Sequence, residues 1–296
     1  MNELKQSSRA GAAARLLLAT DLGPGCDRAM DRAAQLTGEW GGELTALIVG
    51  NLLSSPERIL AWAEGADEKA LTEAVRQQLM RELKAAGVDA QARVVNHADK
   101  AAAIRETAQT VGADVIVCGA SGRGLLERVL GSTVERLAGT AAQPLLLVRR
   151  RPAGPYRKIA VATDCSASSR QALLSAAGLF PQRELDLCHV VTPLMSGLAA
   201  PRHGGDSVDM AQTELPEFIA ATQLPAGSRI KPSVQRGSVE TALTNYVRRH
   251  DVELVVLGSH GRSGLLDLLI GSTAMKLLEW LPCDVLLVPD SRARGT

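Results

Sequence analysis

Short apolar runs alternate with amphipathic stretches along the second half of the chain, a pattern typical of alternating strands and helices. A helix is expected to begin at Ser166 or Ser168 and to end near Gly178, and apolar residues spaced by four predict another within 237–250. The expected strands are 158–163, 184–191, 229–235, 253–258 and 284–289. Further helices are expected at 206–222 and 273–280.

The first half shows the same alternation, with strands expected near 15–20, 43–49, 90–95, 114–118 and 145–149. Between residues 56 and 86 one helical face carries Leu60, Leu71, Leu79 and Leu83. The strand at 253–258 is apolar on both faces, which indicates burial under helices on two sides, whereas Pro232 places its strand at an edge or lies at a strand end. Each half is therefore expected to be a Rossmann-like, doubly wound parallel sheet of about five strands.

Three blocks of sequence recur in the same order at nearly the same offset, which indicates a duplication. RLLLATD (15–21) matches KIAVATD (158–164), ADVIVCGASGRG (113–124) matches VELVVLGSHGRSG (252–264), and PLLLV (144–148) matches DVLLV (284–288). We therefore predict two domains, at 14–150 and 156–290. The Pro- and Gly-containing linker RRRPAGPY joins them.

Composition narrows the classes of function. The 296 residues carry a formal net charge of +1 and only 2% aromatic residues, so neither a nucleic-acid nor an anionic membrane partner is expected. No apolar run reaches the roughly 18 residues of a membrane helix. The five cysteines include no CxxC and the five histidines show no ligand spacing, so we expect reduced thiols, no metal site and a cytoplasmic location.

A glycine-rich loop carries the candidate chemistry of the second half. Gly258 directly follows an apolar strand, and Gly261 and Gly264 are expected to take up positive φ and bring the backbone close to a ligand. One phosphate group would then lie near Gly261 and Arg262. The alternative is that Gly258 is simply a turn glycine, and His260 within the loop is expected to pack or bond locally.

Gly271, Ser272 and Thr273 open the following helix, where unpaired amides and the helix dipole favour a second phosphate group. Alternatively, Ser272 or Thr273 is an ordinary helix cap. The loop is neither a Walker loop, because no Gly-Lys-Ser/Thr follows, nor the dinucleotide fingerprint, which would follow the first strand. At the ends of the first strands, Asp21 and Asp164 would either meet a nucleobase or ribose, or cap the next helix.

The order of these motifs resembles that of the universal stress protein family, whose nucleotide-binding members carry G-x2-G-x9-G-Ser/Thr. In this sequence the order is VATD, a strand-end Val, RGSVETAL, G-SH-G-RSGLLDLLI-GST and DVLLVP. The resemblance covers both halves. It implies a Rossmann-like fold that binds ATP, and a last strand that pairs two domains, so that 144–148 and 284–288 would form an intramolecular pseudo-dimer. The family's nucleotide contacts would fall on Ala162, Thr163, Asp164, Val191, Gly258, Gly261, Arg262, Gly271, Ser272 and Thr273.

The first half departs from the motif. Gly122 and Gly131 enclose eight residues instead of nine, and one missing residue displaces backbone amides by about 3 Å. His97 or Ala98 replaces the glycine of RGSVETAL. The weaker candidates in this half are Thr20, Asp21, Val49, Gly119, Gly122, Gly131, Ser132 and Thr133. The alternative to a second nucleotide site is a first half that has lost the motif and serves only to pair with the second half.

We therefore expect a stress-response or signalling protein that binds an adenine nucleotide, ATP with or without Mg²⁺, chiefly in the second domain. Binding would change its conformation or its choice of protein partner. The alternatives are a slow ATPase, against which stand the missing P-loop lysine and paired carboxylates, and a nucleotide-free scaffold. The protein partner and the pairing of two such chains as a homodimer stay open.

Overall fold

The computed structural model describes residues 14–23, 26–50, 68–120, 131–192, 208–261 and 270–290. Among the predicted positions, Leu60, Gly122, Arg262 and Gly264 lie outside these residues. The chain divides into two compact units, one of residues 1–117 with 152–155 and one of residues 118–151 with 156–296. The last helix and strand of the first repeat are thus grouped with the second repeat, and the predicted domain limits stay a prediction.

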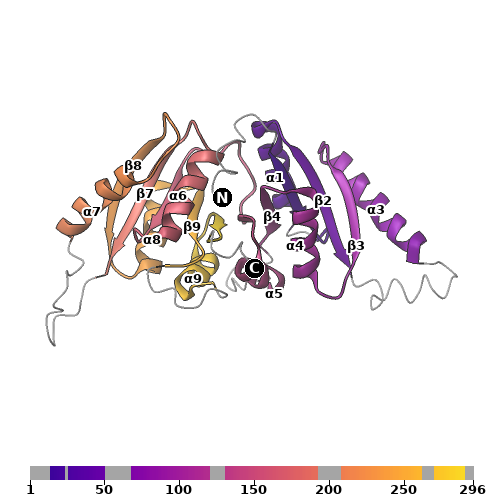
Figure 1. Cartoon of the computed structure of the whole chain (residues 1–296). Helices are drawn as coiled ribbons and strands as arrows, with labels where there is room; N and C mark the ends of the chain where they lie inside the picture. The colour runs from indigo at the N-terminus through magenta and orange to yellow at the C-terminus, as the bar shows by residue number, and fades with distance from the viewer. Residues whose placement is uncertain are drawn as a thin grey trace, which may run out of the picture. The chain divides into compact units, whose positions relative to one another are not determined.

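The first unit contains alternating strands and helices (Figure 1). They are β1 (Arg15–Ala19), α1 (Asp27–Trp40), β2 (Glu43–Gly50), α3 (Glu68–Ala85), β3 (Gln91–Asn96), α4 (Lys100–Val111) and β4 (Val115–Gly119), which straddles the boundary. The strand order is β3-β2-β1-β4, and β2 pairs in parallel with both β1 and β3. The strands expected from sequence are confirmed.

The second unit holds the end of the first repeat and all of the second. Its elements are α5 (Ser132–Thr140), β5 (Leu145–Val148), β6 (Ile159–Thr163), α6 (Ala167–Leu179), β7 (Glu184–Val191), α7 (Val208–Ala221), β8 (Arg229–Arg236), α8 (Val239–His250), β9 (Leu254–Gly258), α9 (Ser272–Trp280) and β10 (Asp284–Val288). The strand order is β5-β10-β9-β6-β7-β8. Strands β6 to β10 pair in parallel, whereas β5 pairs antiparallel with β10. The predicted pairing of the two last strands is therefore confirmed.

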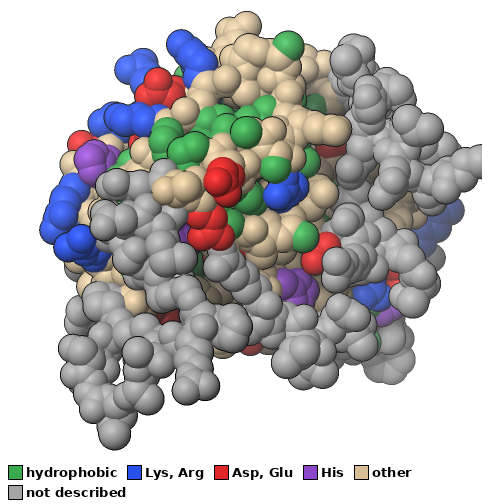
Figure 2. All heavy atoms as spheres, turned by 60° about the vertical axis from the view of Figure 1, so that its left-hand side comes forward, with side chains coloured by type: hydrophobic (Ala, Val, Ile, Leu, Met, Phe, Trp, Pro, Cys, Tyr) green, Lys and Arg blue, Asp and Glu red, His purple; other side chains and the backbone are tan. Residues whose placement is uncertain are grey.

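Burial explains why these runs form a doubly wound sheet. Four consecutive residues of β9, from Leu254 to Leu257, are buried, and because successive strand residues point to opposite faces, both faces are covered. Strand β8 is an edge strand and contains Pro232, as predicted. The outer surface is mixed in charge: acidic and basic side chains both lie on the face shown in Figure 2.

Helix α6 begins as predicted but ends later. The Ser166 hydroxyl caps it by accepting the Ser169 amide at 3.2 Å. The helix was expected to end near Gly178, and it ends one residue later at Leu179, so the predicted end is confirmed although Gly178 is not the cap. Phe180 takes the C-cap position instead and packs edge-on against Tyr156, with ring centroids 5.9 Å apart.

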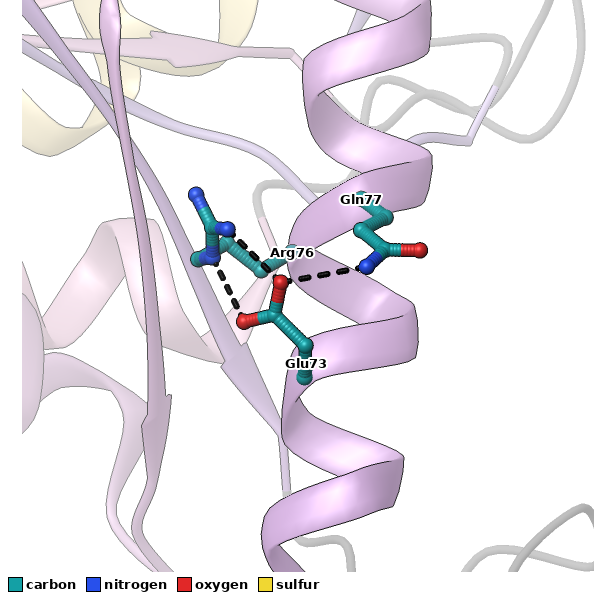
Figure 3. Close-up of polar contacts among 3 residues, drawn as sticks. All are labelled: Glu73, Arg76 and Gln77. Carbon is teal, nitrogen blue, oxygen red and sulfur yellow. Dashed lines mark hydrogen bonds and ion pairs between the residues drawn. The ribbon is translucent and has the colours of Figure 1, made fainter.

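The predicted apolar face of α3 is confirmed at Leu79 and Leu83, which are buried. The opposite face is exposed and polar. Figure 3 shows Glu73 accepting two hydrogen bonds from Arg76, at 2.7 and 2.8 Å, and one from Gln77 at 3.2 Å. These bonds hold the pKa of Glu73 at about 2, below its ordinary 4.5. Fully exposed pairs of this kind are screened by water and contribute little to fold stability.

Candidate functional site

Three chain segments meet where the strand order of the second repeat reverses. Strands β6 and β9 lie side by side and in parallel, so their carboxyl ends open at the same edge, which is where ligands bind in such sheets. An ideal Cβ on Gly261 would lie 2.9 Å from Asp164 Oδ2. The amide of Gly271, just before α9, donates to the Ser259 carbonyl at 2.9 Å. The structure therefore brings the ends of β6 and β9 and the start of α9 together, as predicted.

The bend after β6 is held by side chains. The Thr163 hydroxyl accepts the Cys165 amide at 3.0 Å, and Asp164 Oδ1 accepts the Ser166 amide at 3.1 Å. Cys165 has a φ of 60°, in the left-handed region that a non-glycine residue rarely occupies. Asp164 thus shapes the turn, and the alternative that it is the helix cap is wrong, because Ser166 takes that position.

The first repeat builds the same bend after β1. The Thr20 hydroxyl accepts the Leu22 amide at 3.0 Å, Asp21 accepts the Gly23 amide at 2.8 Å, and Leu22 has a φ of 58°. Burial favours the neutral form of Asp21, but hydrogen bonds from the Cys26 thiol and the Gly23 amide outweigh it, so the pKa of Asp21 is lowered. Asp21 is not the cap of α1 either, since Cys26 stands there.

Gly258 is needed for packing inside the domain. A Cβ at this position would lie 2.4 Å from the Ser168 hydroxyl and 2.9 Å from the Ser168 backbone, so only glycine lets α6 approach β9 this closely. The predicted positive φ of Gly261 is wrong: the described residues with positive φ do not include it. What Gly261 provides instead is room for the Asp164 carboxylate.

Helix α9 begins without a side-chain cap. Gly271 is its N-cap in extended conformation, and Ser272 and Thr273 are its first, exposed residues. The alternative that a hydroxyl of Ser272 or Thr273 caps the helix is therefore wrong. Among the described residues no side chain caps this first turn, and its amides are the groups that the phosphate prediction requires.

Two residues between Gly258 and Gly261 form contacts that sequence reasoning did not foresee. The buried Ser259 hydroxyl accepts the Asp290 amide at 3.2 Å and lies 2.9 Å from His260 Nδ1. The His260 amide in turn donates to the Ser168 hydroxyl at 3.3 Å. His260 Nε2 is a buried atom with no hydrogen-bond partner in the structure as described. If the Ser259 hydroxyl donates to Nδ1, the proton of a neutral ring resides on Nε2, which becomes an unpaired donor.

Two further predicted contacts lie beside this edge. Ala162 precedes the bend and is half-buried, and Val191 ends β7 and is buried. The Val191 carbonyl accepts the Gly237 amide at 3.1 Å, and Gly237 has a φ of 132°, which explains the glycine of RGSVETAL.

Strand register identifies the counterparts in the first repeat. Strands β2 and β7 have the same length and the same pairing offset, so Gly50, one residue beyond Val49, occupies the position of Val191. The amide of His97 donates to the Gly50 carbonyl at 3.0 Å, as Gly237 does to Val191. The first repeat therefore has a glycine where the second has valine, and a histidine where the second has glycine.

The remaining first-half candidates lie in the second compact unit. Gly119 ends β4 and is buried, and Gly131 is the N-cap of α5 without side-chain assistance, with Ser132 and Thr133 as the first helical residues. This start matches that of α9. The Ser259 position of the other repeat is Ala120 here, so the hydroxyl beside the loop is absent.

The structure as described holds no group of three or more His, Cys, Asp or Glu side chains suited to a metal ion. Nor is any helix in the described ranges long and apolar enough to cross a membrane.

Comparison with known proteins agrees with this architecture. The model of the universal stress protein family matches residues 13–149 and again 155–289. Universal stress protein A homolog 2 of Coxiella burnetii is 32% identical over 145 residues, which are 45% of this chain and 94% of that protein. Universal stress protein YxiE of Bacillus subtilis is 29% identical over 146 residues, 45% of this chain and 99% of that protein.

Solved structures match over nearly the whole chain. A universal stress protein from Archaeoglobus fulgidus superposes with a TM-score of 0.67 at 19% identity, covering 94% of this chain and 98% of its own. A putative universal stress protein from Pseudomonas aeruginosa gives 0.63 at 19% identity, covering 96% and 95%. With two matched copies of the family domain and this fold, the chain belongs to the universal stress protein family as a tandem member.

Proposed function

We propose that the second repeat binds an adenine nucleotide, ATP with or without Mg²⁺, and that binding changes the conformation or the partner of a cytoplasmic stress-response protein. The observation that carries this is the meeting of Asp164, Gly261 and the uncapped start of α9 at the reversal of strand order. An anion there would meet amides rather than side-chain caps.

The proposed nucleotide contacts form two groups, one for the base and ribose and one for the phosphates. The base and ribose would lie against Ala162, Thr163, Asp164 and Val191, where a carboxylate and a buried apolar side chain are available. The phosphates would take the loop residues and the start of α9: Gly258, Gly261, Arg262, Gly271, Ser272 and Thr273. With the Ser259 hydroxyl donating to His260 Nδ1, Nε2 carries a proton that has no acceptor among the described residues and that an anionic oxygen would accept.

Titration calorimetry of the full chain with ATP, ADP, AMP and cyclic AMP tests the proposal. Cyclic AMP is included because one matched universal stress protein is described in complex with it. We expect one nucleotide per chain. The variant Gly261→Ala places a methyl group 2.9 Å from Asp164 Oδ2 and should weaken binding at least tenfold, roughly the effect of 1.4 kcal/mol.

The matched control is Ser132→Ala, at the equivalent helix start of the first repeat, paired with Ser272→Ala in the second. Only Ser272→Ala should lower the affinity. Two nucleotides per chain would contradict the assignment to the second repeat alone. If no nucleotide binds, the remaining hypothesis is a nucleotide-free scaffold. Steady release of phosphate from ATP that Gly261→Ala abolishes would indicate a slow ATPase.

A further inference from the structure

The pairing of β5 with β10 has an unusual feature: it is apolar throughout. Leu145, Leu146 and Leu147 lie opposite Leu287, Leu286 and Val285, and all are buried. A slip of two residues in one direction would again pair leucine or valine with leucine, with Leu147 opposite Leu287 and Val148 opposite Leu286. Hydrophobic pattern alone therefore does not exclude this slipped register, and it does not specify which apolar strand β5 takes as its partner.

A buried carboxylate lies at the end of this pair. Asp284, the first residue of β10, is 0% exposed. Its Oδ1 accepts the amides of Arg149 and Arg150 at 2.8 and 3.0 Å, and its Oδ2 accepts the Tyr156 hydroxyl at 2.6 Å. Hydrogen bonds to an ionised group are stronger than neutral ones, so this single side chain holds both ends of the linker that follows β5.

The two arginines make a second set of bonds with their side chains. Arg149 donates to the Leu278 carbonyl, and Arg150 Nε donates to the Pro282 carbonyl at 2.8 Å. These carbonyls lie at and just beyond the C-terminal end of α9, whose last turn contains no basic residue of its own. Cations are favoured at this end of a helix dipole. The residues directly after β5 are thereby fixed to the residues directly before β10.

The carboxylate exists in only one of the two repeats. Pro144, directly before β5, corresponds to Asp284 at the start of β10, and Pro289-Asp290 follow β10 where two arginines follow β5. A β5–β5 pair would therefore lack the carboxylate, and a β10–β10 pair would lack the arginines. A shifted β5–β10 pair would leave the Asp284 carboxylate buried away from its donors, which is costly.

We propose that Asp284, Arg149, Arg150 and Tyr156 form a register clamp that commits β5 to the β10 of its own chain in one register. The competing partner that the clamp excludes is a strand of a second copy, since an apolar last strand without the clamp pairs equally well with its like. The clamp needs no ligand and is independent of the proposed nucleotide site.

The variant Asp284→Asn tests this, because it keeps the shape but removes the charge and turns one acceptor into a donor. In the full chain we expect concentration-dependent dimers or larger species by sedimentation velocity. We also expect at least tenfold faster trypsin cleavage after Arg149 and Arg150, located by mass spectrometry. The matched control is Asp251→Asn, which removes the same charge at the exposed, left-handed C-cap of α8, where asparagine is well tolerated.

If Asp284→Asn stays monomeric and trypsin cleaves it as slowly as it cleaves Asp251→Asn, the proposal is overturned. If Asp284→Asn does not fold, Tyr156→Phe and Arg150→Gln each remove one contact and keep the carboxylate. Hydrogen exchange should then accelerate in residues 145–150 and leave β7 unchanged. Uniform protection across both strands in these variants would equally refute the clamp.

Discussion

Replacing Gly258 by alanine probes the contact on which the geometry of the second-repeat site depends. The new Cβ would lie 2.4 Å from the Ser168 hydroxyl and 2.9 Å from its carbonyl carbon and oxygen. Rotation of the hydroxyl relieves the first contact. It cannot relieve the other two, because they involve the backbone of a buried residue in the first turn of α6. Helix α6 must therefore move away from β9.

Overpacking of this kind costs about 1–3 kcal/mol. An alanine also gains roughly 0.4–1 kcal/mol by restricting the unfolded chain, which leaves a net loss of about 1–2 kcal/mol. For a unit of this size, each kcal/mol lowers the melting temperature by roughly 2–4 °C. The His260 amide donates to the hydroxyl of the displaced Ser168, so nucleotide affinity should fall together with stability.

Thermal unfolding followed by circular dichroism measures the change, with Gly178→Ala as the matched control. Gly178 lies in α6 with no neighbour within 4 Å of an added Cβ, and the helix should gain about 0.5–1 kcal/mol from alanine there. Opposite signs for the two substitutions are expected. If Gly258→Ala melts at or above the temperature of Gly178→Ala, the close approach of α6 to β9 is refuted.

Three further changes test other parts of the molecule. Ser166→Ala removes the cap of α6 and should cost about 1 kcal/mol in urea unfolding, and an unchanged midpoint would argue against capping. Because the pKa of Asp21 is lowered in the folded protein, the ionised side chain stabilises the fold above its ordinary pKa of 3.8, and this stabilisation is lost as the pH falls through the folded-state pKa. Asp21→Asn should therefore lower the free energy of unfolding at neutral pH. A loss of stability that is the same at every pH would contradict this. Burial raises the pKa of Cys188 and Cys283 to about 12, so these thiols should react with an alkylating reagent at about pH 8 only after the protein unfolds. Peptide mass spectrometry locates the label, and labelling of these two cysteines in the native protein would contradict their burial.

The strands were predictable because their signal is local and repeated. Short apolar runs recur in both halves, as in β1 and β9, and the resemblance to the universal stress protein family implied the pairing of the last strands. The end of α6 was predictable to within one residue, but its C-cap residue was not. Gly178 carries a common stop signal, but the ring of Phe180 finds its partner in Tyr156, a contact between residues far apart in sequence.

The sequence predicted which chain segments form the candidate site, but it predicted less well what each residue does there. Glycine spacing indicated the loop, yet it could not distinguish a glycine that admits a ligand from Gly258, which admits a neighbouring helix. The hydroxyl network through Ser168 and Ser259 depends on which strands lie side by side. The same holds for the assignment of Val49, because only strand register shows that Gly50 is the counterpart of Val191.

The two repeats together show which features argue for a ligand and which do not. Both keep the bend with a left-handed residue, Leu22 or Cys165, although such a conformation costs about 1–2 kcal/mol. The first repeat keeps it although it lacks the glycine spacing and has Gly50 in place of the terminal valine of β7, so the bend alone is no evidence for a ligand. In the second repeat, Gly261 lies against Asp164, and His260 Nε2 has no hydrogen-bond partner among the residues that the structure describes. The case for a nucleotide there depends on the loop of His260 and Gly261 and on the start of α9, and the strained bend adds only the placement of the carboxylate.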